Sequence, residues 1–161
     1  MSIAAVREHL SAFEKAEAIL ELEESSATVE LAAQAVGTDP ERIAKTPAFY
    51  DPENAGRALL VVAAGDARLH SGSFKRAFGG KAKMLSPEDV KPLTGHEVGG
   101  VCPFANPPGT RVYLDSSLRR FDLVYPAAGT ANSAVPMTLP ELETTSGAQG
   151  WVDVTRGWQT D

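Results

Sequence analysis

Two features of the chain could carry chemistry: Lys45, and the loop Gly99-Gly100-Val101-Cys102-Pro103. A lysine amine supplies a fixed positive charge, which can face a phosphate or a developing oxyanion. The more ordinary role of a lysine that ends a helix, here before Thr46-Pro47, is to stabilise the helix dipole. A glycine pair can likewise be only a turn, so neither feature identifies a function alone.

Cys102 is the one cysteine of the chain, and it could act as a nucleophile only as a thiolate beside a cation. His96 is the nearest such group in the sequence. A lone cysteine before a proline is more often a small buried hydrophobic residue. A thiol enzyme that acts on a small ester therefore stays open as a minor alternative.

Other chemistries leave no signature in the sequence. His9, His70 and His96 lie far apart, and none pairs with a cysteine or a carboxylate at metal-ligand spacing, so we expect no metal. Neither G-x-x-x-x-G-K-[ST] nor G-x-G-x-x-G occurs, which excludes the cofactor enzymes that use these loops, and we expect no cofactor. The G-x-S-x-G elbow is absent too, although a differently built Ser-His-Asp triad stays open.

The elements around Lys45 decide where its amine goes. Asp39-Pro40 predicts the start of a short helix over residues 40–45, with the aspartate as cap and the proline at the first helical position. Pro47 disfavours helix at Thr46, so we expect Lys45 at a helix-to-strand transition. The apolar run over residues 57–64 predicts a buried strand. Residues 96–110 are too rich in glycine and proline for regular structure.

The remaining predicted elements are short. Helices are expected at residues 2–14, 29–36, 73–78, 86–94 and 139–145, and strands at 18–22, 46–50, 82–85, 111–115, 123–125 and 151–154. Helices and strands that alternate in this way predict a mixed α/β (α+β) fold around one sheet or partial barrel. At 161 residues we expect a single domain over 1–161, with residues 1–24 as part of it and Phe13 in the core.

The charge of the chain bears on its partners. With 15 Lys+Arg and 21 Asp+Glu the net charge is −6, the opposite of what binding to duplex DNA needs, so we expect no DNA. A basic strip interrupts the acidic average: Arg68, Lys75, Arg76, Lys81 and Lys83. Such a strip is more often solvated surface, but it can hold one end of a nucleic acid. The lone cysteine and the lack of a long apolar run predict a cytoplasmic protein, with no membrane partner.

In chain order, several segments resemble the YbaK/ProX-type aminoacyl-tRNA deacylases, free-standing relatives of the bacterial prolyl-tRNA synthetase editing domain. The resemblance covers about residues 28–154. It includes Ala32-Ala33-Gln34-Ala35-Val36-Gly37, Arg42-Ile43-Ala44-Lys45-Thr46, Ser86-Pro87-Glu88-Asp89-Val90 and Glu97-Val98-Gly99-Gly100-Val101-Cys102-Pro103-Phe104. Lys45 and the G-x-x-x-P loop, about 54 positions apart, are its most specific part.

The resemblance implies a YbaK-like fold, with a central mixed, largely antiparallel sheet or partial barrel surrounded by short helices. It implies hydrolysis in trans of the ester that joins a wrong amino acid to tRNA, with Lys45 at the terminal adenosine and Gly99 and Gly100 presenting backbone groups to the aminoacyl moiety. A backbone N–H can approach an ester carbonyl closely where side chains are absent. Because this ester is activated, positioning, electrostatics and one water can suffice without a metal.

The resemblance also implies a set of substrate-binding residues and partners. Around the amino acid it places Thr46, Val101, Cys102, Pro103, Ala128, Gly129 and Asn132. The basic strip is expected to contact the acceptor end of the tRNA, with tRNA for proline or a similar tRNA as substrate and a prolyl-tRNA synthetase as a possible partner. The N-terminal helix could cover the pocket.

Two departures from the family bear on the substrate. Relatives that release cysteine carry a small hydroxyl residue near Ala127 and an acid near Ala134, and both positions are apolar in this chain. We therefore expect a small side chain such as alanine, because pocket selectivity of this kind rests on only ~1–3 kcal/mol. The same replacements leave a rival hypothesis open, a non-catalytic module that binds tRNA ends or a synthetase.

Overall fold

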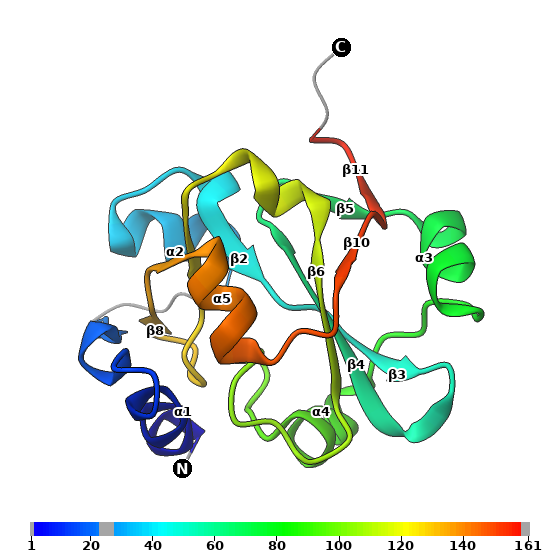
Figure 1. The fold of residues 1–161 in the computed structure, drawn as a ribbon, viewed down its shortest axis with the longest axis horizontal. Helices are drawn as coiled ribbons and strands as arrows, with labels where there is room; N and C mark the ends of the chain where they lie inside the picture. The colour runs from blue at the N-terminus through cyan, green and yellow to red at the C-terminus, as the bar shows by residue number, and fades with distance from the viewer. Residues whose placement is uncertain (1, 23–27, 159–161) are drawn as a thin grey trace.

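A mixed α/β fold is built around one curled sheet in the computed structural model, which describes residues 2–22 and 28–158 (Figure 1). Residues 23 and 24 of the predicted N-terminal segment lie outside the described residues. The helices are α1 (Ser2–Ser11), α2 (Val29–Val36), α3 (Ser71–Phe78), α4 (Pro87–Thr94) and α5 (Leu139–Ser146), with 3₁₀ turns η1 (Ala16–Ala18), η2 (Pro40–Arg42) and η3 (Ser116–Arg120).

The main sheet has the strand order β10-β6-β4-β2-β7-β9, with β3 beside β4. Its strands are β2 (Ile43–Lys45), β3 (Ala48–Asp51), β4 (Asn54–Ala64), β6 (Arg111–Asp115), β7 (Leu123–Pro126), β9 (Met137–Thr138) and β10 (Trp151–Val152). The pairs β10·β6, β6·β4 and β2·β7 are parallel, and β4·β2, β3·β4 and β7·β9 are antiparallel. Two small antiparallel pairs join β1 (Leu20–Glu21) to β8 (Ser133–Ala134) and β5 (Arg68–Leu69) to β11 (Thr155–Arg156). The predicted fold class is confirmed.

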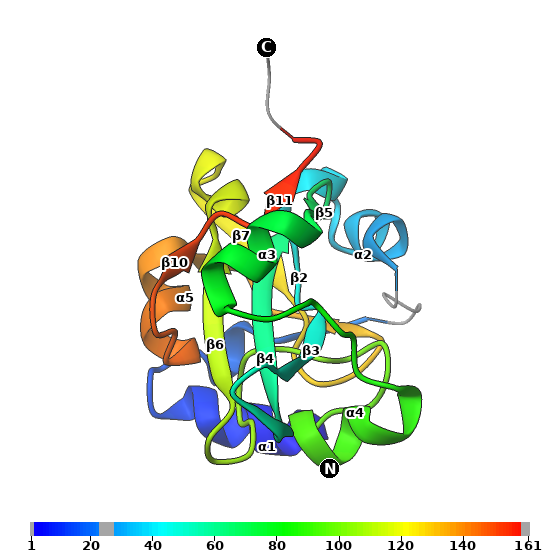
Figure 2. The ribbon, with the colours of Figure 1, turned by 90° about the vertical axis from the view of Figure 1, so that its right-hand side faces the viewer.

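Strand β4 is the centre of the core because its apolar run is buried on both faces. Leu59 and Val61 pack in one cluster with Phe74 of α3, while Leu60 and Val62 belong to the larger cluster on the other face. Helix α3 accordingly lies across one face of the sheet (Figure 2). Burial on both faces explains why this strand reads as a continuous apolar run instead of an alternating one.

The larger core cluster also receives the N-terminal helix, through the buried Val6 and Leu10 of α1. The predicted helix over 2–14 is too long, because α1 ends at Ser11 and Glu14 adopts a positive φ of 60°. Phe13 is 38% exposed, so its predicted place in the core is wrong. In the part of the chain that the structure describes, no helix has both the length and the apolar character needed to cross a bilayer.

The predicted helix over residues 40–45 is wrong from residue 43 on. Only η2 is helical, and Ile43 begins strand β2, whose Ala44 pairs with Ala64 of β4 on one side and with Pro126 of β7 on the other. Strand pairing on both sides stabilises the extended backbone and outweighs the local preference for a helix. Tertiary contacts commonly override local propensity in this way. Lys45 therefore stands on a strand of the sheet and not at a helix end.

Candidate active site

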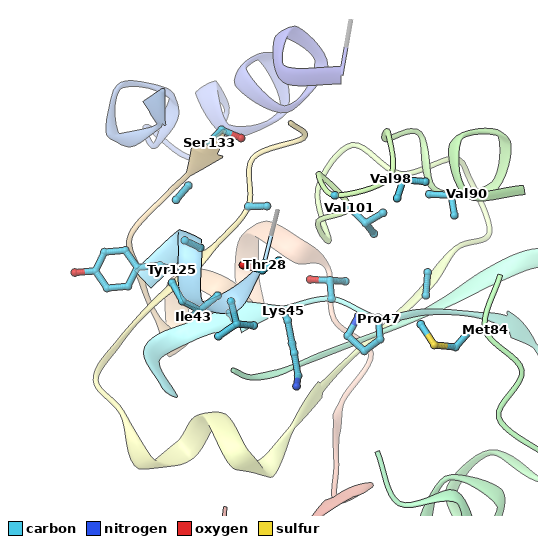
Figure 3. A pocket seen from close by; sticks show the side chains of 18 of the residues that line it. Thr28, Ile43, Lys45, Pro47, Met84, Val90, Val98, Val101, Tyr125 and Ser133 are labelled. Atoms are coloured by element: carbon cyan, nitrogen blue, oxygen red, sulfur yellow. The ribbon is translucent and has the colours of Figure 1, made fainter. Parts of the chain in front are cut away.

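A pocket of about 380 Å³ opens beside β2. Strand β2 forms its floor, the start of α2 and the end of β7 lie at one side, and the loop around residues 98–101 lies at the other (Figure 3). Four of the residues expected at the site line it, namely Lys45, Thr46, Gly99 and Val101. Segments far apart in the sequence, 45–46 and 99–101, therefore border one cavity.

The amine of Lys45 does not point across this pocket. Its Nζ donates to the carbonyl oxygen of Gly65 at 3.2 Å and to that of Ala67, and in Figure 3 the side chain runs away from Val98 and Val101. Burial lowers the pKa of Lys45, a shift that the nearby charges of Asp66 and Glu30 oppose and that of Arg68 reinforces. The cation thus lies at the edge of the pocket, and the pocket interior is left to other groups.

Thr46 contributes a polar group to the pocket. Its hydroxyl is buried and has no hydrogen-bond partner among the described residues. A buried hydroxyl without a partner costs free energy, so a ligand that hydrogen-bonds to Thr46 would gain from it. Within the part of the chain that the structure describes, the Thr46 hydroxyl is therefore available to a ligand in the pocket.

The glycine loop is built by close backbone packing. Gly99 has a φ of +90°, and a Cβ on Gly100 would lie 2.7 Å from the backbone of Gly129 and of Thr130. The Gly100 N–H donates to the Glu97 carbonyl at 3.0 Å. Gly99 lines the pocket, whereas Gly100 supports the loop from behind, with its amide already engaged in a turn.

Cys102 lies in the core and away from the pocket lining. Its Sγ is 3.4 Å from Nε2 of His96, which is 2.7 Å from the Phe104 carbonyl. Complete burial raises the pKa of the Cys102 thiol to about 12. A thiol of this kind is neither a thiolate nor open to an ester, which removes the alternative of a thiol enzyme that uses Cys102.

Four other expected binding residues also stand outside the lining. Pro103, Ala128 and Gly129 are buried. Asn132 is exposed, and its side-chain amide donates to the carbonyl of Leu22 at 3.0 Å, while its own carbonyl accepts from the Leu22 N–H at 2.7 Å. Asn132 therefore holds the segment after β1 against the β7–β8 connection, while the buried residues support the pocket walls.

Apolar side chains make up most of the pocket wall, and the sequence identified only Val101, Ala127 and Ala134 among them. Ala127 and Ala134, the two departures from the family, do line the pocket, together with Ile43, Tyr125 and Val90. Val98 and Met84, at its mouth, are 66% and 62% exposed. Valine and methionine read as core residues in a sequence, so only the fold could reveal that these two face a cavity.

The basic strip lies outside the pocket. Arg68 is on β5, Lys75 and Arg76 are on α3, and all three are exposed together with Lys81 and Lys83. The Lys83 amine sits 5.3 Å from the centre of the Tyr50 ring. Within residues 2–22 and 28–158, no group of three or more histidine, cysteine or acidic side chains could hold a metal ion.

Comparison with known proteins shows which family the chain resembles. A sequence model described as the aminoacyl-tRNA editing domain matches residues 23–145. A protein of Bacillus subtilis (strain 168), the uncharacterized protein YwhH, is 44% identical over 159 residues, which cover 99% of this chain and 100% of that protein.

Solved structures agree with that match. One described as "a putative trans-editing enzyme for prolyl tRNA synthetase" is similar with a TM-score of 0.85 and 32% identity, covering 97% of this chain and 98% of the other. The hypothetical protein APE2540 gives a TM-score of 0.78 and 30% identity, covering 92% of this chain and 99% of the other.

Proposed function

The chain belongs to the aminoacyl-tRNA editing domain family, and we propose that it is a trans-editing hydrolase that removes a small, wrongly attached amino acid from tRNA. The observation that carries this proposal is the pocket that Lys45 and Gly99 border together. It unites the two most specific features of the sequence in one cavity.

The pocket and its edge would bind different parts of the substrate. The aminoacyl group would enter the apolar cavity, where the Thr46 hydroxyl offers it a hydrogen bond. Lys45 stands at the edge with its amine toward the turn of residues 65–67, so it would meet the phosphate or ribose of the terminal adenosine. Binding energy would then hold the ester in place for one attacking water, which the substrate's own ribose hydroxyl would orient.

The wall of the cavity favours a small apolar side chain. Ala127 and Ala134 line it where a hydroxyl and an acid would favour cysteine, and Ile43 and Val101 complete an apolar surface. A polar side chain would lose hydrogen bonds to water on entering such a wall. Alanine is therefore the expected leaving amino acid.

The acceptor end of tRNA for proline is the proposed partner. The name of a similar structure refers to prolyl tRNA synthetase, and the exposed basic strip offers contacts for the acceptor end. A net charge of −6 keeps the affinity for RNA low. Recruitment by a synthetase would raise the effective tRNA concentration at the pocket.

Deacylation assays with a panel of charged tRNAs test the proposal. Wild type should release alanine from alanyl-tRNA for proline faster than it releases proline, and Lys45→Ala should lower this rate at least ~100-fold, as loss of a catalytic electrostatic contact does. Lys15→Ala is the matched control, because Lys15 pairs with Glu141 outside the pocket. Equal rates for wild type and Lys45→Ala would reject the role of Lys45.

A non-catalytic module is the second candidate function. Two of the groups expected to contact the substrate are already engaged, the Lys45 amine by two carbonyls and the Gly100 amide by Glu97. In that case the protein would bind alanyl-tRNA, and no charged tRNA of the panel would lose its amino acid above the spontaneous rate.

A further inference from the structure

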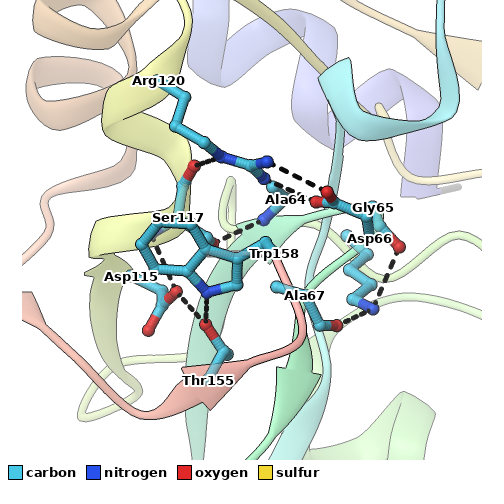
Figure 4. Close-up of polar contacts among 10 residues, drawn as sticks. Ala64, Gly65, Asp66, Ala67, Asp115, Ser117, Arg120, Thr155 and Trp158 are labelled. Atoms are coloured by element: carbon cyan, nitrogen blue, oxygen red, sulfur yellow. Dashed lines mark hydrogen bonds and ion pairs between the residues drawn. The ribbon is translucent and has the colours of Figure 1, made fainter. Parts of the chain in front are cut away.

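The turn that holds the Lys45 amine is itself part of a larger polar assembly (Figure 4). The two accepting carbonyls belong to Gly65 and Ala67, so they flank Asp66 in the chain. An ammonium group has three donors, and these two bonds leave one for a ligand. The position of the amine is therefore set by the position of this turn.

Two contacts join the turn to η3. The Asp66 carboxylate accepts from Nη1 of Arg120 at 2.9 Å and from Nη2 at 2.5 Å, a two-point contact. Just before the turn, the Ala64 N–H donates to Oγ of Ser117 at 3.0 Å. Arg120 also donates from Nε to the Ser117 carbonyl at 3.0 Å, which links the two contacts. A planar guanidinium bound at three nitrogens has a fixed orientation.

The guanidinium of Arg120 is also held by aromatic rings. It lies 4.8 Å from the ring centre of Phe121 and 4.9 Å from that of Trp158. The Trp158 indole donates to Thr155 at 2.7 Å, and Thr155 donates to the buried Asp115 at 2.6 Å. Arg120 is thus attached to the core, and the turn is attached to Arg120.

On its other side the turn packs directly against the wall of the pocket. A Cβ on Gly65 would lie 2.0 Å from the Pro40 carbonyl oxygen and 2.7 Å from Cγ1 of Val29. Val29 lines the pocket. A side chain at residue 65 has no room, so the backbone of the turn reaches the pocket wall because residue 65 is glycine.

We propose that Asp66 and Arg120 are positioning residues for Lys45: their ion pair fixes the Gly65–Ala67 turn, and the turn aims the amine at the substrate. This inference rests on the proposed function. Neither side chain is among the described residues that line the pocket, so both act through Lys45. Their side chains are 30% and 27% exposed, so solvent partly screens the ion pair, and its loss should lower the melting temperature without unfolding the chain. Variants of Asp66 and Arg120 should therefore keep their fold, while the Lys45 amine is displaced.

The charge of Asp66 has a second effect. Burial lowers the pKa of Lys45, Asp66 and Glu30 raise it, and Arg68 lowers it further. Without the carboxylate of residue 66, only Glu30 opposes the lowering of the Lys45 pKa by burial and by Arg68. The amine of an Asp66→Asn variant should therefore lose its proton at a lower pH than the amine of wild type does.

Three variants with matched controls test the proposal. Asp66→Asn is paired with Asp122→Asn, an exposed acid, and Arg120→Met with Arg119→Met, its neighbour on η3, which stacks on Trp151. Arg120→Lys tests whether charge alone suffices. The measurements are an NMR titration of the Lys45 ammonium, kcat and KM on alanyl-tRNA for proline, and the melting temperature.

We expect Asp66→Asn to move the Lys45 titration to lower pH and Arg120→Met to lower kcat/KM roughly 10- to 100-fold, as a displaced catalytic group does. Arg120→Lys should recover only part of that loss, and the control variants should match wild type. Titration and kcat/KM at wild-type values in both Asp66→Asn and Arg120→Met would overturn the proposal, as would equal effects in the controls.

The titration separates this inference from the proposed function, because it needs no substrate. If wild type releases no amino acid, the hydrolase proposal fails, and the Lys45 titration and chemical shifts still decide the role of the ion pair. Changed Lys45 signals in Asp66→Asn and Arg120→Met would then support positioning. Unchanged signals in both would overturn it.

Discussion

At the residue scale, the chemistry of this site depends on where one ammonium group is held. Lys45 stands on a strand, its amine bonds to main-chain carbonyls, and burial lowers its pKa. The two carbonyls hold the ammonium group without an acid bound directly to it, so a third donor can serve an anionic ligand. The Lys45 amine is therefore suited to the phosphate of a terminal nucleotide.

Cys102 gives a residue-scale prediction. Its thiol is fully buried, and its pKa is raised to about 12, so it should play no part in turnover. Cys102→Ala should keep wild-type kcat/KM and lose about 1 kcal/mol of stability through the small cavity. An aromatic disulfide reagent should leave the folded wild type unmodified at pH 8 and react with it in denaturant. Loss of turnover in a folded Cys102→Ala variant would contradict this assignment.

Sequence reasoning predicted two segments that border the pocket but misplaced individual side chains for a physical reason. Lys45, Thr46, Gly99 and Val101 line the pocket as expected. Cys102 follows Val101 directly and yet faces the core. In an irregular loop no period fixes which side chain faces inward, in contrast to a strand or a helix. The glycine motif therefore predicted that this loop borders the cavity, but it did not predict which of its side chains face the cavity.

At the element scale, the pocket depends on two loops that pack backbone to backbone. Gly100 touches Gly129 and Thr130 without room for a Cβ, which holds the 98–101 loop at its distance from β2. The width of the cavity between that loop and strand β2 thus follows from a glycine that does not itself line it.

Gly100→Ala should therefore disturb the pocket. Overpacking against backbone costs about 1–3 kcal/mol, and the displaced loop should lower kcat/KM for alanyl-tRNA. Gly150→Ala is the matched control, since a Cβ at residue 150 meets nothing within 4 Å. Denaturant unfolding and the deacylation assay check both variants. A Gly100→Ala variant with wild-type stability and activity would show that the loops do not set the pocket.

The secondary structure of some elements is determined by local sequence signals, and that of others by pairing in the sheet. The apolar run of β4 and the caps of α2 and α5 are local, and the sequence predicts these elements within a few residues. Strand β2 is only three residues long and extended because β4 and β7 pair with it. No local pattern encodes those partners, so sequence reasoning placed a helix there.

At the scale of the whole molecule, the proposed binding of a tRNA end has to use few contacts, because the protein is acidic. The net charge is −6, and the exposed basic strip runs from β5 through α3 to residue 83. Arg68, at its start, is close enough to Lys45 to lower its pKa. The strip therefore begins beside the edge of the pocket where the acceptor end would enter.

Charge reversal on α3 tests whether the basic strip contacts the acceptor end of the tRNA. Lys75→Glu combined with Arg76→Glu should raise KM for alanyl-tRNA about fivefold or more, leave kcat unchanged and flatten the salt dependence of binding, because fewer counterions are released. Arg119→Glu, on η3 and stacked on Trp151 outside the strip, is the control. Deacylation kinetics at several salt concentrations provide the measurement. An unchanged KM would place the RNA elsewhere on the surface.

The cavity beside β2 is the proposed binding site for the aminoacyl end of tRNA. A crystal structure with a stable amide analogue, alanine linked to the 3′ end of a CCA trinucleotide, tests it most directly. We predict the alanine methyl group against Ala127 and Val101, the Thr46 hydroxyl bonded to the ligand, and the Lys45 amine at the terminal phosphate or ribose. Alanine bound outside this cavity, with Thr46 and Lys45 free of ligand contacts, would contradict this assignment of the site.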